Sequence, residues 1–361
     1  MLEVKNLTIR AGDFQVRDIS FSVQTGSCHV FLGPTGSGKT LILETVAGLR
    51  LPESGTIYLS GEEITSTLPE KRKIAYLPQD LALFPNMTVK DNISYSMRIN
   101  GLDKKESYKR IKSLAQTLEI EGILDRSIHY LSGGEKQRAA LARALASGSK
   151  MMLLDEPLSS LNTRLRRDIW YLLKKIQSEH GLTYLVVTHD LDEASFLGDT
   201  ISIIFEGDQL QTGGKNSVFN HPTSIEAAGI VGVENYFKGV VEKIEENFIV
   251  IYSEEIGTAF KVEKDNSAFP LKEGAHITMG IRANNLFLAE PDNKSMDTNA
   301  AEFVVEAVYE KGSTYTVLLK HLYCKDSKAL AEVFKHNNKL SFNIGQTVKV
   351  LFPGEYIMIL S

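Results

Sequence analysis

A glycine-rich segment near the N-terminus has residue types and spacing that could bind phosphate. It reads GPTGSGKT and fits the pattern G-x-x-x-x-G-K-[ST], a loop between a strand and a helix. Its backbone N–H groups would point at phosphate oxygens, Lys39 would pair with the β- and γ-phosphates, and Thr40 would ligate Mg²⁺. The alternative is a plain glycine-rich turn. The phosphate-binding residues predicted are Gly33, Pro34, Thr35, Gly36, Ser37, Gly38, Lys39 and Thr40.

Two acidic residues could complete a phosphate-transfer site. The apolar run Met151 to Leu154 reads as a buried strand and ends in Asp155 and Glu156. At such a strand end one carboxylate can hold a Mg²⁺-bound water, while its neighbour polarises the attacking water. The alternative is a pair of solvated acids at a strand-to-loop transition.

Two further polar residues stand just past strand ends. Residues 73–77 read as a short strand, and Gln79 beyond it can reach the metal or its water. Residues 183–187 read as another strand, and His189 follows it at a position where its side chain could contact the γ-phosphate. A lone histidine is more often structural than catalytic, so its type alone does not decide its role.

The string LSGGEKQ, residues 131–137, precedes a helical stretch expected from Glu135 to Ala146. Ser132 can cap that helix and bind phosphate, and Gly133 and Gly134 precede its positive end. The sequence therefore carries a second anion-binding helix start, which a single chain rarely needs.

Strands and helices alternate around these residues, which predicts an α/β domain. Phe14 opens one of the strands, where it either stacks on an adenine ring or belongs to the core. The strands expected are 2–10, 14–23, 28–32, 56–60, 73–77, 151–154, 183–187, 201–205 and 209–212, and the helices are 39–48, 104–118, 135–146, 162–180, 190–197 and 223–231.

These motifs follow one another in the order and spacing of the ABC-transporter ATPases, and the sequence resembles that family over about residues 1 to 230. The LSGGEKQ string is its most specific element, because many NTPases share the phosphate loop. The resemblance implies a head-to-tail homodimer that sandwiches two ATP molecules. Each ATP would be held by the phosphate loop of one subunit and by Ser132, Gly133 and Gly134 of the other.

The same resemblance implies roles for single residues. Phe14 would stack on adenine, Gln79 would sense the metal and couple to the membrane partner, and Asp155 would hold Mg²⁺ through water. Glu156 would be the general base, and His189 would clamp the γ-phosphate.

One apolar segment and one substituted residue bear on the match to this family. The apolar run Leu81 to Val89 would dock the coupling helix of a membrane subunit, although from its residues alone a core segment would be the commoner interpretation. Asn162 stands where the family usually has Asp, so its contact with the other subunit would be made by a neutral amide.

Composition sets the outer limits. The 361 residues are 43% hydrophobic and 24% charged, which is enough globular material for two domains. A formal net charge of -5 argues against a nucleic-acid partner. The sequence shows no apolar run of membrane-span length and no signal-peptide pattern, so a cytoplasmic location is expected. Two cysteines are too few for a disulfide framework or a zinc site.

The second half of the chain has a different sequence pattern from the first. We therefore expect two domains, residues 1–232 and residues 233–361. From Asn235 the sequence reads as short alternating strands with frequent glycine. The predicted fold is therefore an α/β phosphate-loop NTPase domain of the ABC ATPase type, followed by a small all-β domain.

The sequence of this all-β domain contains an internal repeat. Residues 240–242 match residues 304–306, and the pattern from Gly274 to Leu288 recurs from Gly345 to Ile359 at one constant offset. Two such strand sets predict a small OB-like barrel. The domain resembles the TOBE-type regulatory domains of ABC importer ATPases, with Arg282-Ala283-Asn284 in place of that family's Arg-Pro-Glu.

One segment of this domain could bind an oxyanion. Lys311, Gly312, Ser313 and Thr314 lie between two strands, and together they offer a backbone nest, two hydroxyls and a positive charge. The alternative is a hairpin turn with a solvated lysine beside it.

The function predicted is that of an ATP-hydrolysing subunit of a binding-protein-dependent importer, which uses ATP and Mg²⁺. It would work as a homodimer under two membrane-spanning permease subunits at the cytoplasmic face of the membrane, with a secreted or periplasmic binding protein as an indirect partner. Pro34-Thr35, Leu43-Glu44 and the segment LFPNMTVKDNI look most like the molybdate/tungstate importer ATPases. Importers of sulfate, ferric iron or polyamine are the alternatives.

A soluble ABC protein without a transport role is disfavoured. A soluble ABC protein that acts in translation would usually contain two ATP-binding cassettes in tandem. One that acts in DNA repair would contain a long coiled coil between the phosphate loop and the LSGGE motif. The segment between Gly33 and Leu131 is short and has no sustained heptads. A purely regulatory module is disfavoured because Glu156 and His189 are present.

Overall fold

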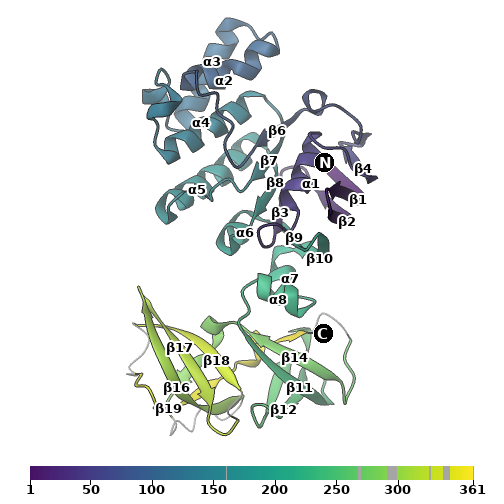
Figure 1. Ribbon diagram of the computed structural model, residues 1–361, viewed down its shortest axis with the longest axis vertical. Helices are drawn as coiled ribbons and strands as arrows, with labels where there is room; N and C mark the ends of the chain where they lie inside the picture. The colour runs from purple at the N-terminus through teal and green to yellow at the C-terminus, as the bar shows by residue number, and fades with distance from the viewer. Residues whose placement is uncertain (160, 267–269, 291–298, 325–326, 336–341, 361) are drawn as a thin grey trace. The chain divides into compact units, whose positions relative to one another are not determined.

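A computed structural model describes residues 1–159, 161–266, 270–290, 299–324, 327–335 and 342–360. The chain divides into two compact units, Met1–Lys215 and Asn216–Ser361 (Figure 1). The short helices α7 (Lys215–Asn220) and α8 (Ile225–Ile230) fall almost entirely in the second unit. The domain boundary expected between residues 232 and 233 stays a prediction.

The central element of the first unit is a six-stranded sheet in the order β10-β9-β3-β8-β7-β6. Strand β10 pairs antiparallel with β9, and the other neighbours run parallel. Every residue of β3, β7 and β8 is buried, as expected for a parallel sheet covered on both faces. Parallel strands end at the same edge, so the loops after β3, β6, β7 and β8 lie together. The strands are β3 (Cys28–Leu32), β6 (Ile74–Leu77), β7 (Met151–Asp155), β8 (Thr183–Thr188), β9 (Thr200–Phe205) and β10 (Asp208–Gly214).

A smaller antiparallel sheet in the order β2-β1-β4-β5 shares the core of this unit. Helix α1 (Lys39–Ala47) belongs to the same apolar cluster, with Ile42, Leu43 and Val46 fully buried. Burial of each such side chain stabilises the fold by roughly 1.5–3 kcal/mol before conformational entropy is counted. The strands are β1 (Leu2–Ala11), β2 (Phe14–Val23), β4 (Ser54–Leu59) and β5 (Glu62–Glu63).

Three helices gather at one side of the first unit, where α4 packs against α2 and α3 (Figure 1). Two others, α5 and α6, follow β7 and β8. None of the helices in the described part of the chain has the length and apolar character needed to cross a membrane. The helices are α2 (Val89–Ile99), α3 (Lys104–Thr117), α4 (Gly133–Ala146), α5 (Thr163–His180) and α6 (Leu191–Leu197).

Helix α2 was not expected from the sequence, because the run before it lacks helical periodicity. Its start is fixed by Thr88, whose side-chain oxygen accepts a hydrogen bond from the backbone N–H of Asp91 at 3.1 Å. The Thr88 hydroxyl also donates to the Asp91 carboxylate at 2.8 Å. The missed signal was thus a Thr-x-x-Asp cap at the end of an apolar run.

The second unit is all-β beyond its short helices, which confirms the predicted fold class. Its strands form two five-stranded sheets, β13-β12-β11-β14-β20 and β15-β19-β16-β17-β18, around one shared apolar cluster. Closure of these sheets into an OB-like barrel stays a prediction. The strands are β11 (Asn235–Ile244), β12 (Phe248–Ser253), β13 (Thr258–Glu263), β14 (His276–Ile281), β15 (Phe287–Ala289), β16 (Ala300–Lys311), β17 (Thr314–His321), β18 (Lys328–Phe334), β19 (Thr347–Leu351) and β20 (Met358–Leu360).

The internal repeat is visible in the strand pairing. The register shifts after Val241 in β11 and again after the matching Val305 in β16. The last strand of each copy crosses to the other sheet, because β20 pairs with β14 and β15 pairs with β19. Each copy therefore completes the sheet of the other.

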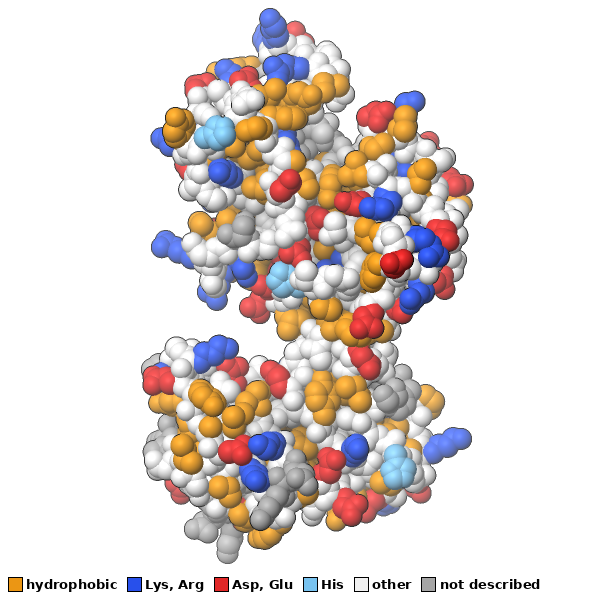
Figure 2. Space-filling model, in the orientation of Figure 1, with side chains coloured by type: hydrophobic (Ala, Val, Ile, Leu, Met, Phe, Trp, Pro, Cys, Tyr) orange, Lys and Arg blue, Asp and Glu red, His pale blue; other side chains and the backbone are white. Residues whose placement is uncertain are grey.

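Charged side chains of both signs are interspersed over the visible face of each unit (Figure 2). This distribution agrees with the modest net charge of -5. On this face neither sign of charge dominates a large area, so it offers no strong single-sign field to a partner.

Candidate active site

The phosphate loop lies between β3 and α1. Gly36 and Gly38 have φ angles of +85° and +99°, a left-handed conformation that glycine adopts at little cost. A Cβ at Gly33 would lie 2.0 Å from the carbonyl oxygen of Ile204, so no side chain fits there. These three glycines therefore fix the path of the loop.

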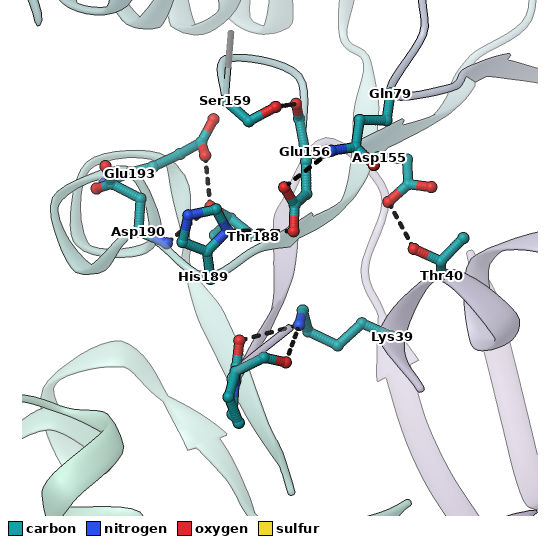
Figure 3. A network of polar contacts seen from close by, with 12 residues as sticks. Lys39, Thr40, Gln79, Asp155, Glu156, Ser159, Thr188, His189, Asp190 and Glu193 are labelled. Atoms are coloured by element: carbon teal, nitrogen blue, oxygen red, sulfur yellow. Dashed lines mark hydrogen bonds and ion pairs between the residues drawn. The ribbon is translucent and has the colours of Figure 1, made fainter. Parts of the chain in front are cut away.

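The Lys39 side chain folds back over the loop (Figure 3). Its Nζ donates to the carbonyl oxygens of Gly33 and Pro34 at 2.9 and 2.7 Å, and only 4% of the residue is exposed. Burial lowers the pKa of Lys39, and the carboxylates of Glu156 and Asp155 oppose that shift. The ammonium group is thus held inside the loop by neutral carbonyl groups, where a phosphate would supply a negative charge.

Thr40 and Asp155 join the start of α1 to the end of β7. Thr40 Oγ1 donates to Asp155 Oδ1 at 3.0 Å (Figure 3), and the Tyr76 hydroxyl donates to Asp155 Oδ2 at 3.4 Å. Burial raises the pKa of Asp155, although these two hydrogen bonds lower it. Both hydrogen bonds described for this buried carboxylate come from neutral hydroxyls, so a cation beside it would favour its charged form.

Glu156 is the centre of a second polar network (Figure 3). Its Oε1 lies 3.1 Å from His189 Nδ1, and its Oε2 accepts from Gln79 Nε2 at 3.3 Å. Glu156 has a φ of +41°, uncommon outside glycine, and its backbone N–H donates to the carbonyl oxygen of Val187 at 2.9 Å. The loops after β6, β7 and β8 thus bring Gln79, Glu156 and His189 together.

A supporting network next to His189 was not predicted from the sequence. The Thr188 hydroxyl donates to Glu193 Oε2 at 2.6 Å, and the Asp190 carboxylate caps α6 by accepting from the Glu193 N–H at 2.9 Å. Arg166 Nη1 donates to the other oxygen of Asp190 at 2.9 Å. The signal that could have revealed part of it is the spacing Asp-x-x-Glu at a helix start.

The LSGGE segment forms a capping box at the start of α4, which begins at Gly133 rather than at Glu135. Ser132 Oγ accepts from the backbone N–H of Glu135 at 3.4 Å, and the Ser132 N–H donates to Glu135 Oε2 at 2.8 Å. Ser132 and Gly133 are exposed, whereas Gly134 is buried. The hydrogen bonds described for Ser132 go to Glu135 and Lys136 of the same helix, so none of them joins it to the phosphate loop.

Phe14 lies beside the phosphate loop. Its ring carbon Cε1 would be 3.1 Å from a Cβ placed on Gly38, and the half-buried ring packs against the apolar cluster of the first unit. The ring therefore packs against the core and lies beside the loop.

The segment expected to dock a membrane subunit needs a correction, because Val89 is buried at the start of α2. We call residues Leu81–Met87 the docking segment, since all of them are at least partly exposed. Its first two residues have φ angles of +64° and +42°. Arg143 of α4 donates to both of their carbonyl oxygens and lies over the Phe84 ring at 5.4 Å.

Comparison with known proteins identifies the family. Residues 16–159 match the family model described as ABC transporter. The molybdate/tungstate import ATP-binding protein WtpC of Thermococcus kodakarensis is 37% identical, over 86% of this chain and 90% of its own length. The chain belongs to the ABC transporter family. The spermidine/putrescine import ATP-binding protein PotA of Nitrosomonas europaea is 36% identical, over 76% of this chain and 74% of its own length.

Solved ABC structures have the same fold. A dimeric ATP-binding cassette, MJ0796, bound to ADP and Pi in a post-hydrolysis state, is 28% identical with a TM-score of 0.54 and covers 59% of this chain and 98% of its own. The protein cbiO1 of Clostridium perfringens, part of the ABC transporter complex cbiONQ, is 28% identical with a TM-score of 0.56 and covers 60% of this chain and 90% of its own.

Membership of this family confirms the predictions of an ABC ATPase with a phosphate-loop α/β fold. The chain is thus an ATP-binding import subunit that hydrolyses ATP. The structure brings most of the predicted residues to one sheet edge and leaves the LSGGE segment apart. The role of each residue stays a prediction.

Proposed function

We propose that this ABC ATPase drives the import of an oxyanion, molybdate or tungstate, as a homodimer attached to two membrane-spanning permease subunits at the cytoplasmic face of the membrane. A secreted or periplasmic binding protein would deliver the anion to the permease. The similarity to WtpC supports the oxyanion, because it extends over 86% of this chain and so includes more than the shared phosphate loop.

The observation that carries the catalytic part is the pair of contacts at the edge of the central sheet, Thr40 with Asp155 at 3.0 Å and His189 with Glu156 at 3.1 Å. In the proposed reaction Lys39 pairs with the β- and γ-phosphates. Glu156 accepts a proton from the attacking water, and His189 holds the γ-phosphate. Phe14 would stack on the adenine ring.

The donor set fits Mg²⁺. Thr40 and Asp155 offer hard oxygen ligands, Asp155 through a water, and Gln79 adds an amide oxygen. Among the described residues no cluster of three or more His, Cys, Asp or Glu side chains could hold a metal ion. The remaining ligands would therefore be phosphate oxygens and water, and the ion would neutralise charge on the phosphates.

The homodimer would complete each ATP site with the LSGGE segment of the other subunit. The exposed Ser132 and Gly133 at the start of α4 support this, because an exposed helix N-terminus attracts anions. Asn162 caps α5 through its Oδ1, which accepts from the Leu165 N–H at 3.1 Å. Its side-chain NH₂ group would make the neutral contact with the second subunit.

The permease contact would be made by the docking segment. Arg143 supports this assignment, since it ties the segment to α4, the helix that the LSGGE residues begin. A shift of the docked permease would then reach the partner's ATP through α4, and a shift of Gln79 would reach Glu156 through their 3.3 Å hydrogen bond.

Uptake by the whole transporter tests the substrate. Cells that lack their own molybdate import would express this chain with its permease and binding protein. We expect molybdate accumulation with the parent chain, its inhibition by tungstate, and none with the Glu156→Gln variant. The variant separates transport by this ATPase from leakage through the membrane.

Polyamine import is the second candidate, because PotA is 36% identical to this chain. Accumulation of spermidine without molybdate would replace the oxyanion by a polyamine. Accumulation of sulfate or ferric iron alone would select one of those importers instead. Neither result would alter the ATPase assignment, which purified protein tests separately.

A further inference from the structure

A cavity of about 10 Å³ lies beside the Glu156–His189 pair, which is room for about one water molecule. Two buried polar atoms of its lining residues make no hydrogen bond within the described part of the chain. They are Glu193 Oε1 and Trp170 Nε1. One can accept and the other can donate, and unpaired buried polar groups are costly.

The other oxygen of Glu193 holds the strand end that carries His189 (Figure 3). Thr188 Oγ1 donates to Glu193 Oε2 at 2.6 Å and accepts from the Asp190 N–H at 3.0 Å. The residues on both sides of His189 are therefore fixed, and they direct its ring toward Glu156. Glu193 itself is 3% exposed.

We propose that Glu193 is a positioning residue for His189, which it holds through Thr188, and that one ordered water in the cavity joins Glu193 Oε1 to Trp170 Nε1. The inference rests on the role proposed above for His189. The water would accept from the indole N–H and donate to the carboxyl oxygen, so both orphaned atoms would gain a partner. The cavity would then be part of the mechanism that sets the geometry of the catalytic pair.

The charges around Glu193 make its protonation sensitive to pH. The pKa of Glu193 is raised to about 7, chiefly by burial and to a smaller extent by the carboxylates of Asp190 and Glu156, while the Thr188 hydroxyl and Arg166 oppose the shift. Below this pH the carboxyl group is neutral. Above it, a negative charge forms next to the Glu156–His189 pair, in a cavity that offers it at most a single water.

Steady-state ATPase kinetics test the positioning role. We expect Glu193→Leu to lower kcat about tenfold or more with little change in KM for ATP, because a small misplacement of a catalytic group is costly. Glu193→Gln keeps an oxygen for Thr188 and should retain most of the rate. A folded Glu193→Leu protein with the parental kcat would overturn the proposal.

If Glu193→Leu does not fold, two variants of Thr188 provide an independent test of the proposal. Thr188→Ser keeps the hydroxyl and should keep kcat, whereas Thr188→Val should lower it like Glu193→Leu. Equal kcat values for Thr188→Ser and Thr188→Val would overturn the proposal. His189→Ala separates the two hypotheses: if it turns over normally, the role proposed for His189 fails, and if it is slow while the Glu193 and Thr188 variants are normal, the inference alone fails.

The single tryptophan reports on the cavity, because Trp170 lines it. We expect a step in Trp170 fluorescence near pH 7 that persists in His189→Ala and disappears in Glu193→Gln. A step that instead persists in Glu193→Gln and disappears in His189→Ala would contradict the assignment. A crystal structure should show a water within hydrogen-bond distance of both atoms, and an empty cavity would refute the water site.

Discussion

Glu156 is the single residue on which turnover is expected to depend most, because it alone contacts both His189 and Gln79 within the described network. We expect Glu156→Gln to bind ATP normally and to lower kcat by roughly 10²–10⁴-fold, since the amide keeps the shape and loses the base. A dimer held by unhydrolysed ATP should accumulate. Size-exclusion chromatography with ATP and Mg²⁺ measures this, and a variant that binds ATP yet stays monomeric would contradict the sandwich.

Lys39 is the control for this experiment, because its ammonium group lies inside the phosphate loop. Lys39→Ala should lose ATP affinity itself, since the charge for the β- and γ-phosphates is gone. It should therefore give neither turnover nor an ATP-dependent dimer. Hydrolysis at the parental rate would show that the phosphate-loop assignment is wrong.

Phe14 contacts both the loop and the core, so its two possible roles predict different measurements. If the ring stacks on adenine, Phe14→Tyr should keep ATP affinity and Phe14→Ala should weaken binding by up to ~3 kcal/mol. If the ring serves only the core, all three proteins should bind ATP equally and Phe14→Ala should unfold at lower temperature without nucleotide. Nucleotide titration and thermal unfolding of the same three proteins distinguish these outcomes.

At the scale of elements, Arg72 ties the end of α1 to the segment before β6. The guanidinium is 1% exposed and donates to the carbonyl oxygens of Thr45, Val46, Thr65 and Thr67 at 2.8–2.9 Å. Arg72→Met would remove all four hydrogen bonds, two of them buried, and should destabilise the first unit by about 2–4 kcal/mol. Urea unfolding followed by Trp170 fluorescence measures that unit, because this tryptophan lies within it.

Arg72→Lys is the matched variant. It keeps the positive charge at the C-terminal end of α1 but cannot form the planar fork, so it should recover only part of the lost stability. Full recovery would show that charge alone matters, and parental stability of Arg72→Met would show that the four hydrogen bonds contribute nothing.

Elements defined by local signals could be predicted from the sequence. Strand β3 and the phosphate loop were predicted because their pattern is continuous, and β2 was predicted with its observed bounds. The partners of Arg72 and Glu193 could not be predicted, since a buried side chain is recognised by what surrounds it and a single sequence gives no contacts. The exchange of β15 and β20 between the two sheets was missed for the same reason, although the repeat itself was recognised.

At the scale of the whole molecule, one feature of each unit bears on how the chain assembles. The LSGGE segment is not joined to the phosphate loop within the described contacts, so a second copy has to supply it if both act on one ATP. In the second unit the two repeat copies complete each other's sheets, so that unit should fold as one piece. We expect any control of the ATPase by the second unit to involve that unit as a whole.

The oxyanion site predicted at Lys311 to Thr314 is the most direct test of such control. The segment forms a tight hairpin with Gly312 at a φ of +54°, and the Thr314 hydroxyl lies 3.1 Å from Glu332 Oε1. Lys311 Nζ lies 3.9 Å from the same oxygen, with 78% of its side chain exposed. The Glu332 carboxylate thus already engages the groups that would hold an anion.

An oxyanion at this hairpin would have to compete with the Glu332 carboxylate for the same groups. Removal of the Glu332 charge should therefore increase the affinity for the oxyanion. Titration calorimetry of molybdate into the full chain should show weak binding to the parent and about tenfold tighter binding to Glu332→Gln, because the variant removes a competing negative charge. Sulfate is the control for a general anion effect, and ATPase rates measured alongside show whether binding inhibits. Tighter binding without a change in rate would place an anion site there without control, since a ligand shifts an equilibrium only by preferring one state. Absence of heat in both proteins would leave the segment as a hairpin that an internal ion pair closes.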